Sequence, residues 1–171
     1  ARDGSIPPMM RLTSLLLALL LTSLPAAHAQ TNDDKIPDPQ IGQAGKDVVW
    51  VPTPPELIDR MFSLAGVTAK DTLFDLGSGD GRIVLAAAKL GATATGVEYD
   101  EKLLAASRRN MAAEKPQGKA TFIQGDMYLA DFSNATVLAL FLLPTNLEVL
   151  RDKFLELAPG TRIVINTFEI P

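Results

Sequence analysis

The stretch Leu73–Gly81 (LFDLGSGDG) decides the fold, because four largely apolar residues run directly into a turn that contains three glycines. The residues that follow, 82–90, are rich in alanine and leucine, a composition that favours a helix. A short apolar strand, a glycine turn and a helix, in this order, are typical of a parallel sheet with crossover helices. The sequence therefore predicts an α/β protein whose first strand ends at the glycine turn.

The same alternation of strand and helix continues along the chain. Further strands are expected at 92–98, 120–124, 135–142 and 162–168, with helices at 55–64, 100–114 and 145–157. Apolar runs such as 137–143 lack the polar alternation of a half-exposed strand, so the sheet is expected to be covered on both faces. We predict a Rossmann-like, doubly wound, mostly parallel sheet in a domain over residues 48–171. Because the sequence stops soon after the fifth strand, we expect this domain to be C-terminally truncated and to lack the final strands of such folds.

The first 29 residues are expected to lie outside this domain, as upstream residues followed by a signal peptide. Arg11 precedes the apolar run 12–24, and the small-x-small pattern Ala27–Ala29 follows it. The run is shorter than the roughly 20 residues of a membrane-spanning helix. We expect export to the periplasm or the exterior, or, as the alternative, a membrane anchor through an uncleaved segment. Residues 30–47 are predicted to be a flexible lead-in.

Composition excludes several kinds of chemistry. The chain has no cysteine, which rules out disulfides, thiolate nucleophiles and cysteine-ligated zinc. Its only histidine, His28, falls in the segment that we expect to be removed, so Ser-His-Asp catalysis is excluded and no metal site is expected. The net charge of −4 offers no basic field for nucleic acid. No catalytic residue is assigned from these observations.

Carboxylates gather where the expected strands end, and they indicate what the glycine turn holds. Asp75 ends the first strand and Asp80 lies in the turn, where the pyrophosphate of a dinucleotide would have to sit. Like charges at about 4 to 6 Å cost several kcal/mol at an effective dielectric of 20. A cationic nucleoside without phosphate is therefore favoured over NAD. S-adenosylmethionine is such a ligand.

Two further acids suit the rest of that ligand. Glu98 ends the second strand at about the spacing from the glycine turn at which an acid accepts both ribose hydroxyls. Asp126 follows the third strand, where it can accept from the adenine amino group. Plainer interpretations stay open: Asp80 as a helix cap, Glu98 as a solvated strand end and Asp126 as a turn residue.

These residues resemble a known family. The segments Asp75–Gly81 (DLGSGDG), Gly96–Glu98 and Gly125–Asp126 look like those of the class I S-adenosylmethionine-dependent methyltransferases, over about residues 48–168. More narrowly, Trp50–Pro54 (WVPTP) and Gly79–Ala88 (GDGRIVLAAA) are similar to the archaeal protein lysine methyltransferases and the mitochondrial ATP synthase c-subunit lysine methyltransferase. The resemblance implies a Rossmann-like fold and S-adenosylmethionine as the cofactor.

The resemblance also implies a set of site residues. The cofactor-binding candidates are Asp75, Gly77, Ser78, Gly79, Asp80, Gly81, Glu98, Asp126 and Met127. The substrate-facing candidates are Trp50, Thr53, Leu143 and Pro144. Residues 53–56 (TPPE) have a second interpretation, as a capping box with Pro55 at the first helical position.

The leading hypothesis is therefore S-adenosylmethionine-dependent methyl transfer to an acceptor, with a protein lysine amine as the candidate. One alternative is a domain that binds S-adenosylmethionine without catalysis. Another is an NAD-dependent oxidoreductase, which the acids around the turn disfavour. Methyl transfer does not need a histidine, because the sulfonium is already an activated electrophile and the protein mainly aligns the reactants and excludes water.

Overall fold

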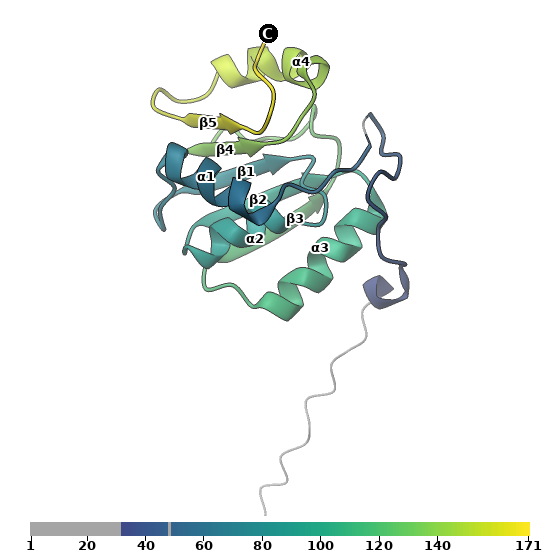
Figure 1. Ribbon diagram of the computed structural model, residues 1–171. Coiled ribbons are helices and arrows are strands. Elements are labelled where there is room, and N and C mark those ends of the chain that lie inside the picture. The colour runs from purple at the N-terminus through teal and green to yellow at the C-terminus, as the bar shows by residue number, and fades with distance from the viewer. Residues whose placement is uncertain (1–31, 48) are drawn as a thin grey trace, which may run out of the picture.

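A computed structural model describes residues 32–47 and 49–171, and it contains a five-stranded, fully parallel sheet with helices on both faces (Figure 1). The strands are β1 (Thr72–Leu76), β2 (Thr93–Glu98), β3 (Lys119–Gln124), β4 (Val137–Leu140) and β5 (Arg162–Ile165). The helices are a short 3₁₀ helix η1 (Asn32–Lys35), then α1 (Pro55–Ala65), α2 (Arg82–Lys89), α3 (Glu101–Glu114) and α4 (Pro144–Leu155). The predicted Rossmann-like α/β fold is confirmed.

The strand order is β3-β2-β1-β4-β5, so the chain starts at the centre of the sheet and winds outward first to one side and then to the other. The winding direction reverses between β1 and β4, and ligands of such sheets bind at the carboxyl ends of the strands near this point. The glycine turn at 77–81 directly follows β1 at that edge. The topology therefore places the turn where a ligand is expected.

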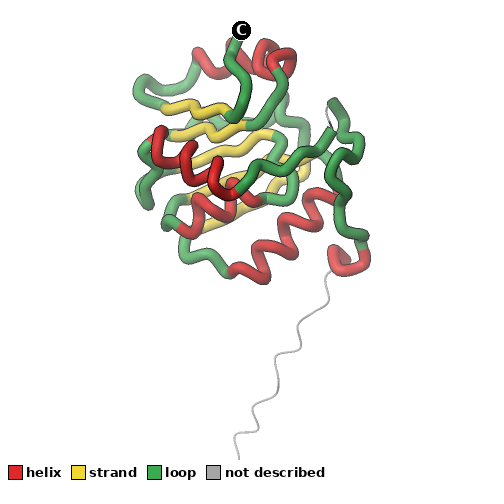
Figure 2. Tube along the Cα trace, viewed as in Figure 1, coloured by secondary structure: helices red, strands yellow, loops and turns green. Residues whose placement is uncertain are grey.

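The helices lie against the strands of the sheet (Figure 2), and two layers of apolar side chains hold them there. On one face, α1 and α2 pack against the sheet through Ile58, Phe62 and Val84, and α3 packs beside α2. On the other face, α4 packs through Leu147 and Leu150. The side chains of the central strands β1 and β4 are almost fully buried, as the lack of polar alternation predicts, whereas those of β5 are half-buried and several of those of the edge strand β3 are exposed.

The helix starts agree only in part with the sequence patterns. Asp100 caps α3 as predicted, because its carboxylate accepts hydrogen bonds from the Lys102 and Leu103 amides at 2.8 and 3.1 Å. The capping box at 53–56 is wrong. The N-cap of α1 is Pro54, which has no capping side chain, and Thr53 lies one residue too early. Proline at the first helical position is confirmed for Pro55.

Strands β4 and β5 are shorter than the sequence suggests. They end at Leu140 and Ile165, and the residues after them, the apolar 141–143 and the mixed 166–168, leave the sheet as loops. A continuous apolar run does not show where ladder pairing stops, because these loop residues are also partly buried. The loops carry side chains to the edge at which the glycine turn lies.

The expected upstream residues and signal peptide, 1–29, lie outside the residues that the structure describes. Among the helices of the described residues, none combines the length and the apolar character that crossing a bilayer requires.

Candidate active site

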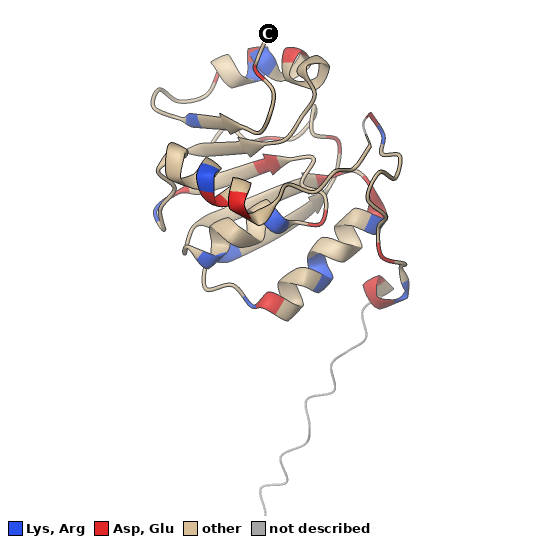
Figure 3. Cartoon of the chain, in the orientation of Figure 1, with Lys and Arg blue, Asp and Glu red and all other residues tan. Residues whose placement is uncertain are grey.

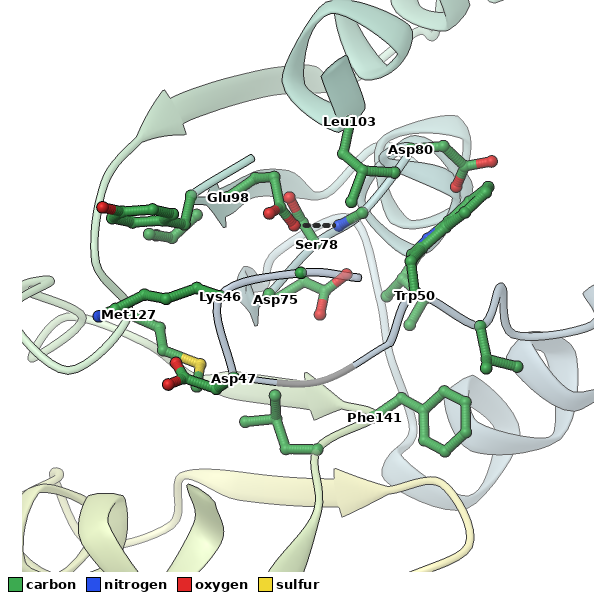
Figure 4. A pocket seen from close by; sticks show the side chains of 18 of the residues that line it. Lys46, Asp47, Trp50, Asp75, Ser78, Asp80, Glu98, Leu103, Met127 and Phe141 are labelled. Carbon is green, nitrogen blue, oxygen red and sulfur yellow. Dashed lines mark hydrogen bonds between the residues drawn. The ribbon is translucent and has the colours of Figure 1, made fainter. Parts of the chain in front are cut away.

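A cavity of about 300 Å³ opens at the carboxyl edge of the sheet (Figure 4). Its floor is the glycine turn with the ends of the strands, and its roof is a segment that precedes α1. Of the predicted residues, those that line this cavity are Asp75, Gly77, Ser78, Gly79, Asp80, Glu98, Asp126, Met127, Trp50, Thr53 and Leu143. The structure thus brings together residues that are widely separated along the chain.

Two predicted residues lie outside the cavity lining. Gly81 is the N-cap of α2, and a Cβ atom built there would lie 2.5 Å from Phe122 and 2.8 Å from Ser107. Its glycine character therefore serves the close packing of α2 rather than the cavity. Pro144 is the first residue of α4 and is exposed, while Leu143 before it reaches the cavity.

The roof is a short hairpin that we call the strap, residues 40–47 and 49–53. It is closed by backbone hydrogen bonds from Gly42 N to Trp50 O and from Trp50 N to Gln43 O. The Trp50 indole lies against Gly79, because a Cβ atom built on Gly79 would be 2.5 Å from the indole Nε1. Gly79 has φ +58°, so the turn needs glycine here both for backbone conformation and for contact with the roof.

Asp75 is a buried carboxylate that faces the cavity, with 3% of its surface exposed. Within the described residues it makes no hydrogen bond or ion pair through its side chain. Burial, and then the charges of Glu98 and Asp80, raise the pKa of Asp75 well above its ordinary value. Such a group is stabilised in its ionised form by a cation that enters the cavity.

Glu98 is held in place by two backbone amides. Its Oε2 accepts from Gly79 N at 2.7 Å, shown as the dashed line in Figure 4, and its Oε1 accepts from Asp100 N at 2.8 Å. Burial raises the pKa of Glu98, and these amide donors oppose the shift. Glu98 thus connects the end of β2 to the glycine turn and presents an oriented carboxylate to the cavity.

Asp80 is neutralised by Arg82, which corrects the expectation that its charge faces a ligand unpaired. Arg82 donates from Nε and Nη2 to the two Asp80 oxygens at 2.9 and 2.7 Å. The same guanidinium donates from Nη1 to the Thr53 carbonyl at 3.1 Å. Arg82 therefore binds the strap to the glycine turn, a role that its position in the helical pattern does not reveal.

Asp126 is also paired, with a residue that the sequence analysis missed. Lys46 Nζ donates to Asp126 Oδ2 at 2.6 Å and lies over the rings of Tyr99 and Tyr128, 5.0 and 5.6 Å from their centroids. The hydrogen bond from Lys46 lowers the pKa of Asp126. Residues 45–47, at the end of the segment predicted to be a flexible lead-in, line the cavity.

The start of this segment is tied to α3. Arg109 donates to the backbone carbonyls of Asp33 and Ile36 and to the Asp38 carboxylate at 2.7 Å. Nothing in the local pattern signals these contacts, because the partners lie more than 70 residues apart. Four contacts therefore place the lead-in and the strap: Arg109 of α3 with residues 33–38, Lys46 with Asp126, Trp50 with Gly79, and Arg82 with the Thr53 carbonyl.

Arg82→Ala is expected to release the strap from the glycine turn. Trp50 is the only tryptophan of the chain, so its fluorescence reports directly on the strap. We expect stronger quenching of Trp50 by acrylamide in Arg82→Ala and an intermediate effect in Arg82→Lys, which keeps the charge but loses the planar two-point contact. Arg60→Ala, on the exposed side of α1, is the control. Equal quenching in the wild type and all three variants would show that Arg82 does not hold the strap.

Comparison with known protein families identifies the family to which this chain belongs. Residues 75–171, more than half of the chain, match the ANTKMT methyltransferase domain. The chain is a member of this methyltransferase family. It is an S-adenosylmethionine-dependent enzyme of Rossmann-like fold. This family agrees with the resemblance of its glycine turn and strand-end acids to those of methyltransferases.

Similar curated proteins point the same way. A protein-lysine N-methyltransferase of Saccharolobus islandicus is 40% identical over 126 residues, which are 72% of this chain and 78% of that protein. An ATP synthase c-subunit lysine N-methyltransferase of Rattus norvegicus is 37% identical over 100 residues, 58% of this chain. The chain covers 46% of the rat protein.

Among solved structures, an RNA methyltransferase from Salinibacter ruber in complex with S-adenosylhomocysteine superposes with a TM-score of 0.68. The two chains are 45% identical, and the match covers 70% of this chain and 80% of that one. S-adenosylhomocysteine is the demethylated form of S-adenosylmethionine, so this ANTKMT-family chain shares its fold with a protein that binds the product of the cofactor.

Proposed function

We propose that this chain transfers a methyl group from S-adenosylmethionine to a lysine amine of a protein. The observation that carries the proposal is the 40% identity to a protein-lysine N-methyltransferase over 78% of that protein. The cavity supports it, because one end carries the acids and glycines that suit the cofactor, and the other end is apolar.

The residues of the cavity fit S-adenosylmethionine. Asp75 is buried and has no partner among the described residues, and its carboxylate would accept hydrogen bonds from the ammonium of the methionine end. The glycine turn lets the cofactor approach the backbone. The oriented Glu98 carboxylate would accept the ribose hydroxyls. Asp126 and Met127 would line the adenine, with Lys46 above them.

The chain's own residues then create the conditions for transfer. The cofactor supplies a methyl group that its sulfonium has already activated. Trp50 on the roof and Leu142 on the floor line the cavity beside the glycine turn and would keep water from the transferred methyl group once the cofactor is bound. An ammonium that enters such an apolar site has its pKa lowered by desolvation, so the lysine amine loses its proton to solvent more readily.

Glu98→Ala is expected to weaken cofactor binding by about 10- to 150-fold. The reason is the loss of a charged acceptor for the ribose, with hydrogen bonds to a charged group contributing about 1.5 to 3 kcal/mol. Isothermal titration calorimetry with S-adenosylhomocysteine measures the change. Glu101→Ala, at the exposed start of α3, is the matched control. An unchanged Kd in Glu98→Ala would remove this residue from the site.

RNA is the second candidate acceptor, because the Salinibacter ruber protein is described as an RNA methyltransferase. The charge distribution favours protein. The chain carries net charge −4, and Figure 3 shows basic and acidic residues interspersed on the visible helices rather than a continuous basic band. RNA binding normally relies on a positively charged surface that neutralises phosphates.

A single labelling experiment separates the two acceptors. The protein is incubated with S-adenosylmethionine labelled in its methyl group and with a bacterial extract that contains both protein and RNA. The protein and RNA fractions are hydrolysed and analysed by mass spectrometry. We expect labelled methyl-lysine. Labelled nucleosides without methyl-lysine would contradict the proposal, as would an absence of label in both fractions.

We also propose that a signal peptide within residues 1–29 directs export and is removed, so that the mature chain begins at Gln30. The apolar run 12–24 and the small residues 27–29 support this. N-terminal sequencing of the protein purified from cells tests it. A mature chain that begins at Gln30 is expected, whereas a chain that keeps the apolar run would favour the membrane anchor.

A further inference from the structure

A strained turn follows β5 at the edge of the cavity. Thr167 has φ 71°, which is unusual for a β-branched residue, and Phe168 N donates to Asn166 O at 2.8 Å across it. Asn166 is buried, and its own amide donates to Leu140 O at 2.8 Å. Non-glycine residues in this conformation cost about 1–3 kcal/mol and gather at functional sites.

The turn presents Phe168 to Phe141. The two rings are stacked with centroids 6.3 Å apart and planes at 21°, and both residues line the cavity. Phe141 directly follows β4, so the pair joins the ends of β4 and β5. The strained turn at Thr167 therefore places Phe168 beside Phe141, and the two rings form an aromatic wall of the cavity.

This wall lies at the opposite end of the cavity from the polar contacts. In the order β3-β2-β1-β4-β5, Asp126 and Glu98 follow the strands on one side of β1, whereas Phe141 and Phe168 follow the strands on the other. Figure 4 shows Phe141 at the end away from Lys46. The cofactor contacts proposed above use the glycine turn and the β2 and β3 side, and they leave the aromatic end unassigned.

The chemistry of this end suits an aliphatic chain. Leu142 and Leu143 continue the wall. None of the ion pairs among the described residues involves a side chain of 141–143 or 166–168. A lysine side chain is an apolar stem with a polar tip, and its stem gains free energy from burial against aromatic faces. An aromatic face also attracts an amine that is still charged.

We propose that Phe141 and Phe168 form the wall that receives the stem of the acceptor lysine, with the Thr167 turn holding Phe168 in position. This inference rests on the proposed lysine methyl transfer. The pair determines acceptor affinity and leaves the binding of the cofactor to the other end of the cavity.

The experiment measures initial rates of methyl-lysine formation against increasing amounts of heat-denatured bacterial extract protein, at saturating S-adenosylmethionine. Phe141→Ala and Phe168→Ala are expected to raise the apparent KM for the extract protein about tenfold, and Phe168→Leu less, since it keeps apolar volume. Calorimetry with S-adenosylhomocysteine is expected to give an unchanged Kd in all three. Leu129→Ala, at a residue that is 83% exposed and away from the cavity, is the control.

An unchanged KM in the folded Phe168→Leu and alanine variants would overturn the inference. So would a Kd for S-adenosylhomocysteine that rises together with KM, because the wall would then belong to the cofactor site. A wild-type protein that forms no methyl-lysine is a different outcome, which overturns the proposed function and this inference with it.

Discussion

Asp75→Asn is expected to weaken S-adenosylmethionine binding while making the cofactor-free protein more stable. The binding loss follows from removing one partner of a buried charge pair, which costs about 2 to 5 kcal/mol, or roughly 30-fold or more in Kd. The gain in stability follows from the pKa of Asp75, which burial raises well above its ordinary value. A buried carboxylate with a raised pKa opposes folding when it is ionised.

The sign of this effect fixes its pH dependence. Because the pKa of Asp75 is higher in the folded than in the unfolded protein, its favourable contribution is fully present below the unfolded value of about 3.8 and is lost as pH rises through the folded pKa. The asparagine variant has no such loss. The difference in melting temperature between Asp75→Asn and wild type should therefore grow as pH rises from about 4 to neutrality.

Thermal unfolding at several pH values and calorimetry with S-adenosylmethionine measure both effects. Asp152→Asn is a matched control, because its side chain is 88% exposed. A variant that is less stable than wild type at neutral pH would show that Asp75 supports the fold through contacts, and tight cofactor binding would remove it from the site.

Gly79→Ala is expected to displace Trp50 and to lower cofactor affinity about 5- to 150-fold. The added Cβ atom would lie 2.5 Å from the indole Nε1, and overpacking of this kind typically costs about 1–3 kcal/mol. The strap or the glycine turn must move to relieve the collision. Calorimetry with S-adenosylhomocysteine and the fluorescence of Trp50 follow the two consequences independently.

Gly160→Ala separates the collision from backbone strain. Both glycines have positive φ, +58° at Gly79 and +92° at Gly160, but a Cβ atom at Gly160 would meet nothing within 4 Å. Its alanine variant should lose about 1–2 kcal/mol of stability and keep the wild-type Kd. If both variants bind the cofactor equally well, the close contact between Gly79 and the roof has no part in binding.

The double variant Trp50→Ala/Gly79→Ala tests the collision itself. Removing the indole removes the atom with which the new Cβ atom collides, so the two changes should not add. Cofactor affinity in the double variant close to that of Trp50→Ala alone is expected. An additive loss would mean that alanine at position 79 disturbs the turn by itself.

Local patterns predicted much of this fold because they report local physics. The glycine turn, the Asp100 cap and the Ala-rich helix α2 each depend on residues close in sequence, and the structure has them where they were expected. The capping box at Thr53 failed because α1 begins at Pro55, which makes Pro54 the N-cap and leaves Thr53 one residue too early.

The sequence predicted the acidic side of the candidate site but not its basic residues or its two phenylalanines. Asp75, Glu98 and Asp126 were found because parallel strands bring their carboxyl ends to one edge. Lys46 and Arg109 were missed because their partners are 71 to 80 residues away, and no pattern in one sequence connects such pairs. Phe141 and Phe168 resembled further strand residues, since apolar runs look alike whether they continue a ladder or leave it.

The cover of the cavity and the folded sheet are also separate along the chain. Within the described residues, every strand of the sheet and every α-helix begins after Pro54, while the cover of the cavity comes from the stretch before it. The cover of the cavity and the packed sheet therefore come from consecutive parts of the polypeptide, while the acids and glycines that face the ligand belong to the sheet part. Exchanging that leading stretch between relatives would change the rates at which the cofactor binds and leaves. The packing of the leucines and valines in the core beneath it would stay the same.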